Sequence, residues 1–478
     1  MHRFTKIVAT LGPASSNQSL LARLIAAGTD VVRLNFSHGT AADHGARVDA
    51  LHAAASSVRR TVGIMADLQG PKIRVGKFAG GKVLLKNKQP FVLDVDCKLG
   101  DAYHVGLDYP ELVNDVAQGD VLLLNDGRIV MDVETVEPRQ VHCRVRVGGE
   151  LSNNKGINKQ GGGLTAPALT AKDMEDIRTA AALNVDFVAI SFPSSGADMR
   201  LARELLHAAG SNALLVAKIE RVEAIANLED ILHASDGAMV ARGDLAVEVG
   251  DAAVPALQKR IIRAAREMNK FVITATQMME SMISSPVPTR AEVSDVANAV
   301  LDGTDAVMLS AETASGEYPV ETVEAMARIC IEAEKSSEVT LDRHFLDRVF
   351  SRIDQSVAMA ALFTAYHLKV KAIAALTESG STALWMSRLN SGVPIYAMTP
   401  STRTRYRVTL FRGVTPLMIR YQGQDREELL LDTERVLIDA GAVEHGDLIV
   451  LTIGEPLGSP GGTNTMKIVR VGEHAAAT

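Results

Sequence analysis

The stretch Leu214–Leu245 reads LLVAKIERVEAIANLEDILHASDGAMVARGDL and repeats one design twice. Each half contains an apolar run of strand length that ends in charged residues, and a helical pattern separates the halves. Lys218 and Glu220 are two residues apart, so on a strand they point to the same side. The second run closes on three residues, Arg242, Gly243 and Asp244.

A cation and two carboxylates at the ends of neighbouring strands predict a site for a divalent metal ion and an anion. Oxygen ligands favour Mg²⁺ or Mn²⁺ over Zn²⁺. The alternative is that these are two buried strands whose last residues simply meet solvent, because short motif matches carry false positives.

The same strand–helix design recurs on both sides of this stretch. Six further runs of strand length end in polar residues: Thr5–Pro13, Asp30–Gly39, Thr61–Arg74, Asp186–Phe192, Phe271–Gln277 and Asp305–Glu312. Helical patterns separate them, and Thr289 followed by Glu292 is a capping-box start. Eight parallel βα units predict an α/β fold with a closed (β/α)₈ TIM barrel, and a doubly wound open sheet is the alternative.

The alternation of strand and helix patterns is interrupted between about Lys72 and Pro167, where short runs of alternating apolar and polar residues replace the helical patterns. Asn125–Gly127 (NDG) is a hairpin turn signal. This segment predicts an inserted, mostly antiparallel β domain. A separate α/β pattern follows residue 345, so we expect a barrel over 1–71 and 168–345, the inserted β domain over 72–167, and a C-terminal α/β domain over 346–478.

Composition narrows the class of protein. The chain has 478 residues, of which 47% are hydrophobic and 22% charged, and its formal net charge is −7. A negative net charge argues against nucleic acid as the main partner. Three scattered cysteines, no signal-peptide core and no bilayer-length apolar run predict a cytoplasmic protein without membrane attachment.

A TIM barrel carries its active site at the carboxyl ends of its strands. Besides the residues named above, those ends hold Arg33, Asn35, Ser37, His38, Asp67, Lys72, Arg74, Thr276, Gln277, Ser310 and Glu312. Cations, a carboxylate pair and hydroxyls around one mouth suit an anionic, metal-bridged substrate such as a phosphate ester. Each residue alone could be a surface arginine, a core hydroxyl or a helix cap. The chain has no P-loop and no protein-kinase signature.

A second candidate site lies in the C-terminal segment. The loop Thr377, Glu378, Ser379, Gly380, Ser381 and Thr382 (TESGST) follows a predicted strand and precedes a predicted helix. Hydroxyls and backbone N–H groups at a helix start suit a phosphate, although a plain capped turn is the alternative.

Many segments of the chain, in this order, resemble pyruvate kinases over nearly its full length. They include TKIVATLGPAS (Thr5–Ser15), AGTDVVRLNFSHG (Ala27–Gly39), ADLQGPKIR (Ala66–Arg74), SFPSS (Ser191–Ser195), VAKIERVEAI (Val216–Ile225), MVARGDLAVEV (Met239–Val249), ITATQMMESM (Ile273–Met282), Pro288–Pro319 and TESGSTA (Thr377–Ala383). The resemblance implies phosphoryl transfer from phosphoenolpyruvate to ADP, giving pyruvate and ATP. It also implies that the inserted domain is a mobile β-barrel lid, that the C-terminal domain is regulatory, and that the protein is a homotetramer.

The resemblance also implies roles for individual residues. Glu220 and Asp244 match Mg²⁺ ligands, Lys218 matches the lysine facing the migrating phosphoryl group, and Arg33 matches a phosphate-binding arginine. The backbone at the expected helix start, Arg242, Gly243 and Asp244, would hold the substrate carboxylate. Thr276, with Ser310 and Glu312, would belong to the relay that protonates the enolate, and whether Thr276 or water delivers the proton stays open. The positions matched to the nucleotide are Asn35, His38, Arg74 and the lid residue Lys155.

One departure from the common family pattern concerns monovalent cations. Many members need K⁺ and read DTKGPEIR where this chain reads DLQGPKIR, with Leu68 and Lys72 at two of the changed positions. Asn35, Ser37 and Asp67 still match K⁺ ligands. The ammonium of Lys72 would replace K⁺, so the chain resembles the K⁺-independent branch of the family.

The resemblance assigns the loop Thr377–Thr382, with a late loop at Gly454–Thr465, to a phosphorylated allosteric effector of unknown identity. Two other functions remain as alternatives. A metal-dependent lyase or aldolase would form a pyruvate enolate with the same residue types, and a catalytically silent metabolite sensor would keep the fold.

Overall fold

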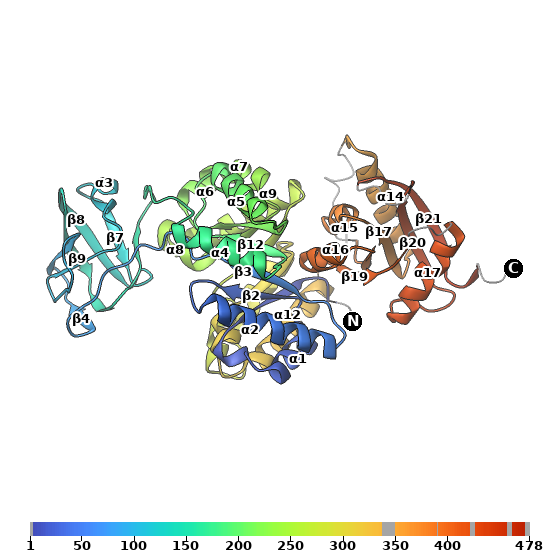
Figure 1. Ribbon diagram of the computed structural model, residues 1–478, viewed down its shortest axis with the longest axis horizontal. Coiled ribbons are helices and arrows are strands. Elements are labelled where there is room, and N and C mark those ends of the chain that lie inside the picture. Colours follow the sequence, from blue (N-terminus) through green and yellow to red (C-terminus); the bar gives the residue numbers. More distant parts are fainter. Residues whose placement is uncertain (1–2, 337–348, 390, 421–425, 457–460, 474–478) are drawn as a thin grey trace.

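The computed structural model describes residues 3–336, 349–389, 391–420, 426–456 and 461–473. Figure 1 shows three parts in a row, with the barrel between the inserted sheets and the C-terminal sheet. A closed barrel, inserted sheets and a separate α/β unit confirm the predicted fold class. The domain boundaries stay predictions, and the expected boundary at 345 lies outside the described residues.

Eight parallel strands close the barrel in the order β1-β16-β15-β14-β13-β12-β3-β2. Their bounds are β1 Lys6–Leu11, β2 Val31–Asn35, β3 Gly63–Asp67, β12 Phe187–Ile190, β13 Leu214–Ile219, β14 Gly237–Ala241, β15 Phe271–Ala275 and β16 Ala306–Leu309. Because β1 pairs with both β2 and β16, the open-sheet alternative is wrong.

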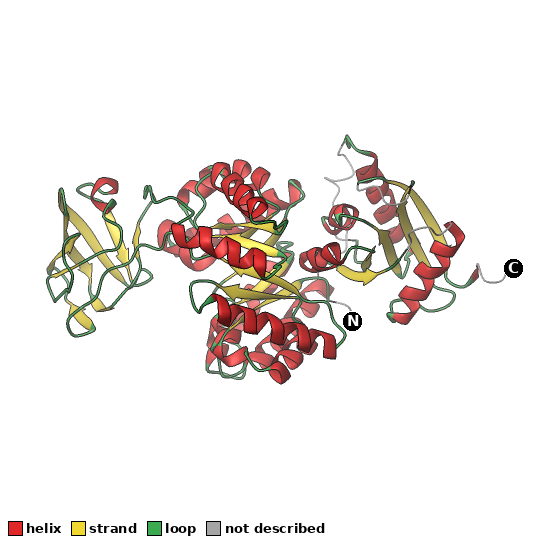
Figure 2. Cartoon of the chain, in the orientation of Figure 1, coloured by secondary structure: helices red, strands yellow, loops and turns green. Residues whose placement is uncertain are grey.

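Helices surround the barrel strands, as Figure 2 shows. They are α1 Gln18–Ala27, α2 Ala41–Ser57, α4 Ala171–Ala182, α5 Gly196–Ala208, α6 Val222–Ala226, α7 Leu228–Ala234, α8 Arg242–Val249, α9 Val254–Glu267, α10 Arg290–Leu301, α11 Ala311–Ala314 and α12 Pro319–Ser336. The predicted capping box is confirmed at α10, where the Thr289 side chain accepts from the Glu292 N–H.

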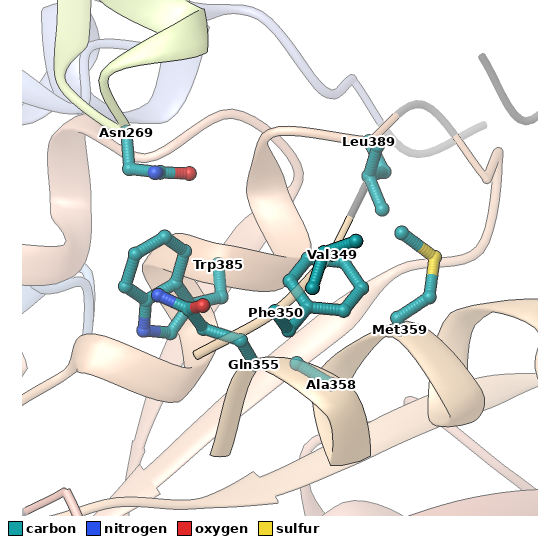
Figure 3. A pocket seen from close by; sticks show the side chains of 8 residues that line it. All are labelled: Asn269, Val349, Phe350, Gln355, Ala358, Met359, Trp385 and Leu389. Carbon is teal, nitrogen blue, oxygen red and sulfur yellow. The ribbon is translucent and has the colours of Figure 1, made fainter. Parts of the chain in front are cut away.

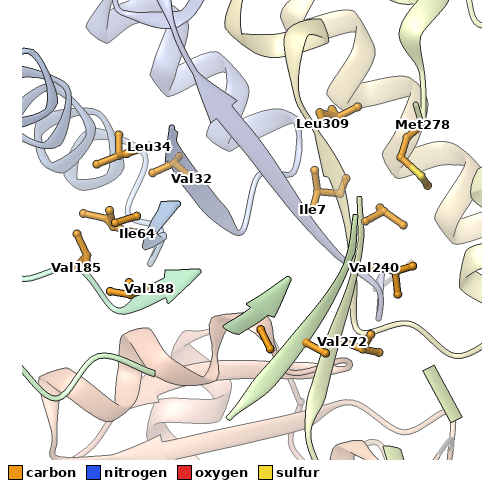
Figure 4. Packing of buried hydrophobic residues seen from close by; sticks show 14 of the residues in the cluster. Ile7, Val32, Leu34, Ile64, Val185, Val188, Val240, Val272, Met278 and Leu309 are labelled. Atoms are coloured by element: carbon orange, nitrogen blue, oxygen red, sulfur yellow. The ribbon is translucent and has the colours of Figure 1, made fainter. Parts of the chain in front are cut away.

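Two apolar layers hold this arrangement together. Outward-facing side chains such as Val32, Val240 and Leu309 pack against the helices (Figure 4). Inside the barrel, Phe187 meets Phe271 edge-on with ring centroids 5.8 Å apart, and Phe271 lies 6.0 Å from Phe411 of the C-terminal unit. Apolar packing therefore closes one end of the barrel, and polar side chains collect at the other.

The insert between β3 and α4 has its own apolar core. Its six-stranded sheet has the order β11-β7-β8-β9-β5-β6, and β10 pairs with β4 in a ribbon. The bounds are β4 Lys82–Leu85, β5 Pro90–Asp94, β6 His104–Val105, β7 Val121–Leu124, β8 Ile129–Glu137, β9 Gln140–Val147, β10 Gly149–Ser152, β11 Ile157–Lys159 and α3 Leu112–Asp115. The predicted hairpin is confirmed, because Asn125, Asp126 and Gly127 have positive φ between β7 and β8.

The C-terminal sheet has the order β19-β18-β17-β20-β21. Its elements are α14 Ile353–Leu368, β17 Ala372–Leu376, α15 Ser381–Ser387, β18 Ile395–Thr399, α16 Thr402–Arg407, β19 Val414–Met418, α17 Arg426–Asp439, β20 Leu448–Gly454 and β21 Thr463–Arg470. The sequence did not predict β19. Pro416 has no backbone N–H to donate, and an edge strand such as β19 tolerates this loss.

Candidate active site

Lys218 is the centre of a charged cluster at the mouth of the barrel. Its Nζ lies 2.9 Å from Glu220 Oε1 and 3.2 Å from Asp67 Oδ1. Arg33 reaches the same Asp67 carboxylate, with Nε 2.6 Å from Oδ2. Strands β2, β3 and β13 therefore bring together four of the charged residues that the sequence placed at strand ends.

Burial and charge act on these groups in opposite directions. Burial disfavours the charged ammonium of Lys218, but Asp67 and Glu220 outweigh this effect, so the pKa of Lys218 lies above its usual value. Burial raises the pKa of Glu220 to about 7, against the attraction of Lys218. For Asp67 burial is outweighed by Arg33 and Lys218, and its pKa lies below the usual range. Lys218 therefore stays positively charged. The buried carboxylate of Glu220 beside it would be stabilised by additional positive charge.

Thr276 has a strained backbone next to this cluster. Its φ of 67° lies in the left-handed region, which a β-branched residue rarely adopts. Its hydroxyl donates to Ala275 O at 2.6 Å and accepts from the Gly243 N–H at 2.9 Å. The start of α8 is therefore held against Thr276, and the two lie at neighbouring strand ends as the sequence predicted. The Gly243 N–H donates to Thr276 within the protein.

Arg242 does not offer its side chain to a substrate. The guanidinium is buried and donates to Thr276 O at 2.7 Å and to Asp295 Oδ1 at 2.7 Å. It holds the strained turn after β15 in place. Any contact of Arg242 with a substrate would therefore come from its backbone, as the sequence analysis expected.

Ser310 and Glu312 lie together after β16. The Ser310 N–H donates to Glu312 Oε2 at 2.7 Å, and the Met279 N–H donates to Oε1 at 3.2 Å. Burial raises the pKa of Glu312. The buried Ser310 hydroxyl has no hydrogen-bond partner among the described residues, and no bond there joins it to Thr276. The expected proton relay through these residues stays a prediction.

The residues present fit a divalent cation of the Mg²⁺ type. Glu220 Oε1 is buried and completes no hydrogen bond within the described ranges, although Lys218 is within ion-pair distance. Its other oxygen, Oε2, accepts from the Phe192 N–H at 2.8 Å, which fixes the carboxylate. Among the described residues no group of three or more His, Cys, Asp or Glu could hold a metal. Mg²⁺ commonly takes one or two carboxylates and completes its shell with substrate and water.

The residues assigned to the nucleotide lie in separate places. His38 is exposed on the loop after β2, where Asn35 Oδ1 accepts from the Ser37 N–H at 3.1 Å. Arg74 lies between β3 and β4, and Lys155 lies between β10 and β11 of the insert. An isolated antiparallel bridge joins Arg74 to Gly156, and Arg74 Nη1 donates to Asn154 O at 3.1 Å. The structure therefore brings Arg74 near Lys155, but among the described residues no hydrogen bond or ion pair joins either of them to His38.

Lys72 also lies at the lid junction. A side chain at Gly156 would meet Lys72 Cε at 3.5 Å, and the Lys72 N–H donates to Gly70 O at 2.9 Å. Leu68 is buried in the apolar layer behind the mouth. The cations that act on Asp67 are Arg33 and Lys218. The replacement of K⁺ by Lys72 thus stays a prediction.

Two polar residues at the mouth were missed by the sequence analysis. Ser191, after β12, accepts from Lys218 Nζ at 2.7 Å and donates to Leu68 O at 2.7 Å. Thr10, in β1, accepts from Arg33 Nη1 at 3.1 Å. Both residues occupy strand ends, so the rule that selected the other site residues could have found them.

The C-terminal loop Thr377–Thr382 forms a compact turn. Thr377 Oγ1 accepts from the Gly380 N–H at 2.9 Å, and Ser379 Oγ donates to Ser381 Oγ at 3.1 Å. Thr382 Oγ1 lies 2.6 Å from Thr463 Oγ1, so part of the expected late loop reaches this turn. Residues 457–460 of that late loop lie outside the described residues.

Two cavities lie away from the barrel mouth. One, of about 220 Å³, is lined by Trp385, Met359 and other apolar side chains, together with the amides of Asn269 and Gln355 (Figure 3). Another, of about 370 Å³, is lined by residues of the barrel and of α16. None of the helices in the described ranges combines the length and apolar character needed to cross a membrane.

Comparisons with known proteins converge on one family. The family model described as "Pyruvate kinase, barrel domain" matches residues 2–323, and "Pyruvate kinase, alpha/beta domain" matches residues 355–469. The chain is 52% identical over 475 residues to pyruvate kinase II of Salmonella typhimurium, covering 98% of this chain and 99% of that protein. It is 42% identical to a pyruvate kinase of Mycobacterium intracellulare, covering 99% of each chain.

A solved structure gives the same result. A crystal structure of a pyruvate kinase from Cryptosporidium parvum matches with a TM-score of 0.92 and 33% sequence identity. The match covers 98% of this chain and 96% of that one. The likeness extends through barrel, insert and C-terminal unit alike, which leaves the lyase or aldolase alternative without support.

Proposed function

Because the chain belongs to the pyruvate kinase family, we propose that its barrel mouth carries out Mg²⁺-dependent phosphoryl transfer from phosphoenolpyruvate to ADP. Membership implies phosphoenolpyruvate and ADP as substrates and a glycolytic transferase as the enzyme class. Beyond family membership, we propose the metal requirement, the roles of individual residues and the regulation of this enzyme.

The observation that carries the proposal is the position of Lys218 between two carboxylates. Its ammonium, 2.9 Å from Glu220, offsets charge on a phosphoryl group that leaves the enol oxygen. Arg33 lies on the other side of Asp67 and can hold phosphate oxygens. Glu220 and Asp244 would hold the metal, which when bound supplies charge neutralisation at the phosphate.

The second half of the reaction adds a proton to the enolate carbon. Thr276 presents a hydroxyl fixed by Gly243 and Ala275 beside the cluster, and Ser310 presents a buried hydroxyl without a partner in the described chain. We assign the proton path to these hydroxyls together with Glu312. Arg74, His38 and Lys155 would contact ADP, and Lys155 would reach it only when the lid closes, which also excludes water.

A coupled assay tests the proposal directly. Formation of pyruvate from phosphoenolpyruvate and ADP is followed with lactate dehydrogenase, with Mg²⁺, with Mn²⁺ and after metal removal. Turnover that requires one of these cations and is lost in Glu220→Gln supports it. Full turnover in a chelator, or in correctly folded Glu220→Gln, would contradict the metal assignment.

Regulation is proposed for the C-terminal loop. The hydroxyls and N–H groups of Thr377–Thr382, closed by the Thr382–Thr463 contact, fit a phosphorylated metabolite. A panel of sugar phosphates and nucleotides should shift the phosphoenolpyruvate saturation curve, and Ser381→Glu should abolish the shift. An unchanged curve with every compound would contradict it. A homotetramer and a cytoplasmic location complete the proposal, and sedimentation of the purified protein tests the former.

A further inference from the structure

The cavity of about 370 Å³ lies where the amino-terminal end of the barrel meets α16 of the C-terminal unit. It is at the opposite end of the barrel from Lys218, and it does not include the loop Thr377–Thr382. Its polar lining residues include His52, Asn184, Asp186, Asn212, Arg403 and Arg407, together with the hydroxyl side chains of Ser211, Thr402 and Tyr406. Hydrogen-bond donors therefore outnumber carboxylates around this cavity.

Two arginines give the cavity an excess of positive charge. Arg403 is exposed and has no hydrogen bond or ion pair within the described part of the chain. Arg407 is half-buried and donates to Asn212 O, again without a carboxylate within ion-pair distance among those residues. Burial and then the nearby charge of Arg403 lower the pKa of Arg407. The two guanidinium groups therefore repel each other, and the carboxylates of Asp236 and Asp186 offset this repulsion only in part.

Asp186 is the carboxylate that lines the cavity. Its Oδ2 accepts from the Ile64 N–H at 2.8 Å at the base of β3. Burial raises its pKa to about 7, and Arg407 opposes this shift. The Asp186 carboxylate thus accepts a hydrogen bond from the barrel backbone. Because its pKa is about 7, it is only partly ionised near neutral pH and balances the positive charge of the arginines weakly.

This combination fits a phosphate group joined to a small polar body. Guanidinium groups match phosphate oxygens in geometry and charge, and amides and imidazole suit hydroxyl groups. A volume of about 370 Å³ lies in the range of small-molecule sites. We propose that this cavity is a second ligand site, separate from the TESGST loop, for a phosphate monoester of sugar or nucleotide size.

Its position would let the ligand join two parts of the molecule. Helix α16 carries both arginines, and Arg405 Nε on the same helix donates to Thr61 Oγ1 of the barrel at 2.6 Å. On its other side, Thr404 Oγ1 donates to Glu378 O in the loop Thr377–Thr382. A ligand held by Arg403 and Arg407 would therefore fix α16 between the barrel and that loop.

Titration calorimetry on the full chain tests this site without any activity measurement. The probes are glucose 6-phosphate and adenosine monophosphate, with glucose and adenosine as uncharged counterparts. The protein carries Ser381→Glu, so that a carboxylate already occupies the other candidate site. At least one phosphate ester should bind this protein, and its uncharged counterpart should not.

Charge changes at the cavity should then move affinity in opposite directions. Added to Ser381→Glu, Arg403→Gln should weaken binding by about tenfold or more, because an exposed, unpaired cation is lost. Asp186→Asn should tighten binding, since it removes the opposing carboxylate. Arg263→Gln on α9 alters an exposed arginine outside the cavity and should leave binding unchanged.

Two results would overturn the proposal. One is the absence of binding of either ester to folded Ser381→Glu protein. The other is equal binding by the Ser381→Glu protein with and without Arg403→Gln. Because Arg403 has no partner among the described residues, its loss should not disturb the fold, and an unchanged thermal midpoint checks this.

Discussion

Lys218 Nζ and Glu220 Oε1 lie 2.9 Å apart at the end of β13, and the same ammonium lies 3.2 Å from Asp67 of β3. One cation thus compensates carboxylates from two strands. A metal ion at Glu220 would release part of this attraction and leave the ammonium facing the substrate. Under the proposed metal binding, Lys218 would therefore exchange part of its attraction to Glu220 for an attraction to the substrate.

Replacing this ammonium tests its catalytic role. Lys218→Met should lower kcat by about 100-fold or more, the usual cost of losing a group that stabilises developing charge. Steady-state pyruvate formation measures the loss. Lys371→Met removes an exposed lysine of the C-terminal unit and should retain normal turnover. Wild-type turnover in folded Lys218→Met would contradict the mechanism.

The monovalent-cation prediction concerns Lys72. The native protein should be nearly fully active in Na⁺ buffer without K⁺, whereas Lys72→Glu should require K⁺ because a negative charge replaces the ammonium. Rates measured across a K⁺ series decide this. Strong K⁺ activation of the native protein would show that Lys72 does not take the place of the ion.

The strained backbone of Thr276 predicts an unusual order of stabilities. With φ at 67°, Thr276→Gly should be about 1 kcal/mol more stable than Thr276→Ala, because glycine adopts this conformation without strain. Both variants lose the hydroxyl and should lose turnover alike, while Thr276→Ser should retain most of it. Urea unfolding midpoints and the coupled assay measure these effects. Equal midpoints for the glycine and alanine variants would contradict the strain.

Asp186 predicts a pH dependence of stability. Its pKa is about 7 in the folded protein, above the unfolded value of 3.8, so the folded state binds more protons between these values. The native protein should therefore lose stability as pH rises from about 4 to about 7 through this group, and no further above that. Asp186→Asn should remove this loss of stability, because the amide does not ionise.

The expected gain of Asp186→Asn is about 1–3 kcal/mol at pH 8 and smaller at pH 5, on the scale of a pKa shift of this kind. Unfolding midpoints of both proteins at each pH give the difference. A difference that does not change between these pH values would show that Asp186 does not titrate as described.

A buried ion pair joins the barrel to the C-terminal unit. Arg388 Nη1 lies 2.9 Å from Asp305 Oδ2, and both side chains are almost fully buried. Arg388→Met should cost about 3–5 kcal/mol because it leaves Asp305 buried without its cation. Trp385, the single tryptophan of the chain, lies three residues away and reports unfolding by fluorescence.

The matched control is the double variant Arg388→Met with Asp305→Asn. It should recover part of the lost stability, because the uncompensated charge is removed with its partner. A double variant as unstable as the sum of both single changes would show that the pair contributes through packing alone.

Much of the fold followed from local pattern. Strand runs with polar ends, separated by helical patterns, predicted eight βα units, and the capping pair Thr289–Glu292 placed the start of α10. The edge strand β19 was missed because Pro416 and flanking turn residues hide its alternation. Local pattern also could not decide between an open sheet and a closed barrel, because the β1–β16 pairing joins residues far apart in sequence.

The sequence by itself determined which side chains stand at the strand ends, since the two-residue period of a strand and its polar terminus are local properties. It therefore predicted Lys218, Glu220, Arg33 and Asp67 as one set. Only the tertiary structure decided how they meet: barrel closure brings β2, β3 and β13 together, so one ammonium serves two carboxylates. Docking of α16 against the barrel likewise created the second cavity, because contacts between distant segments depend on packing that no local pattern records.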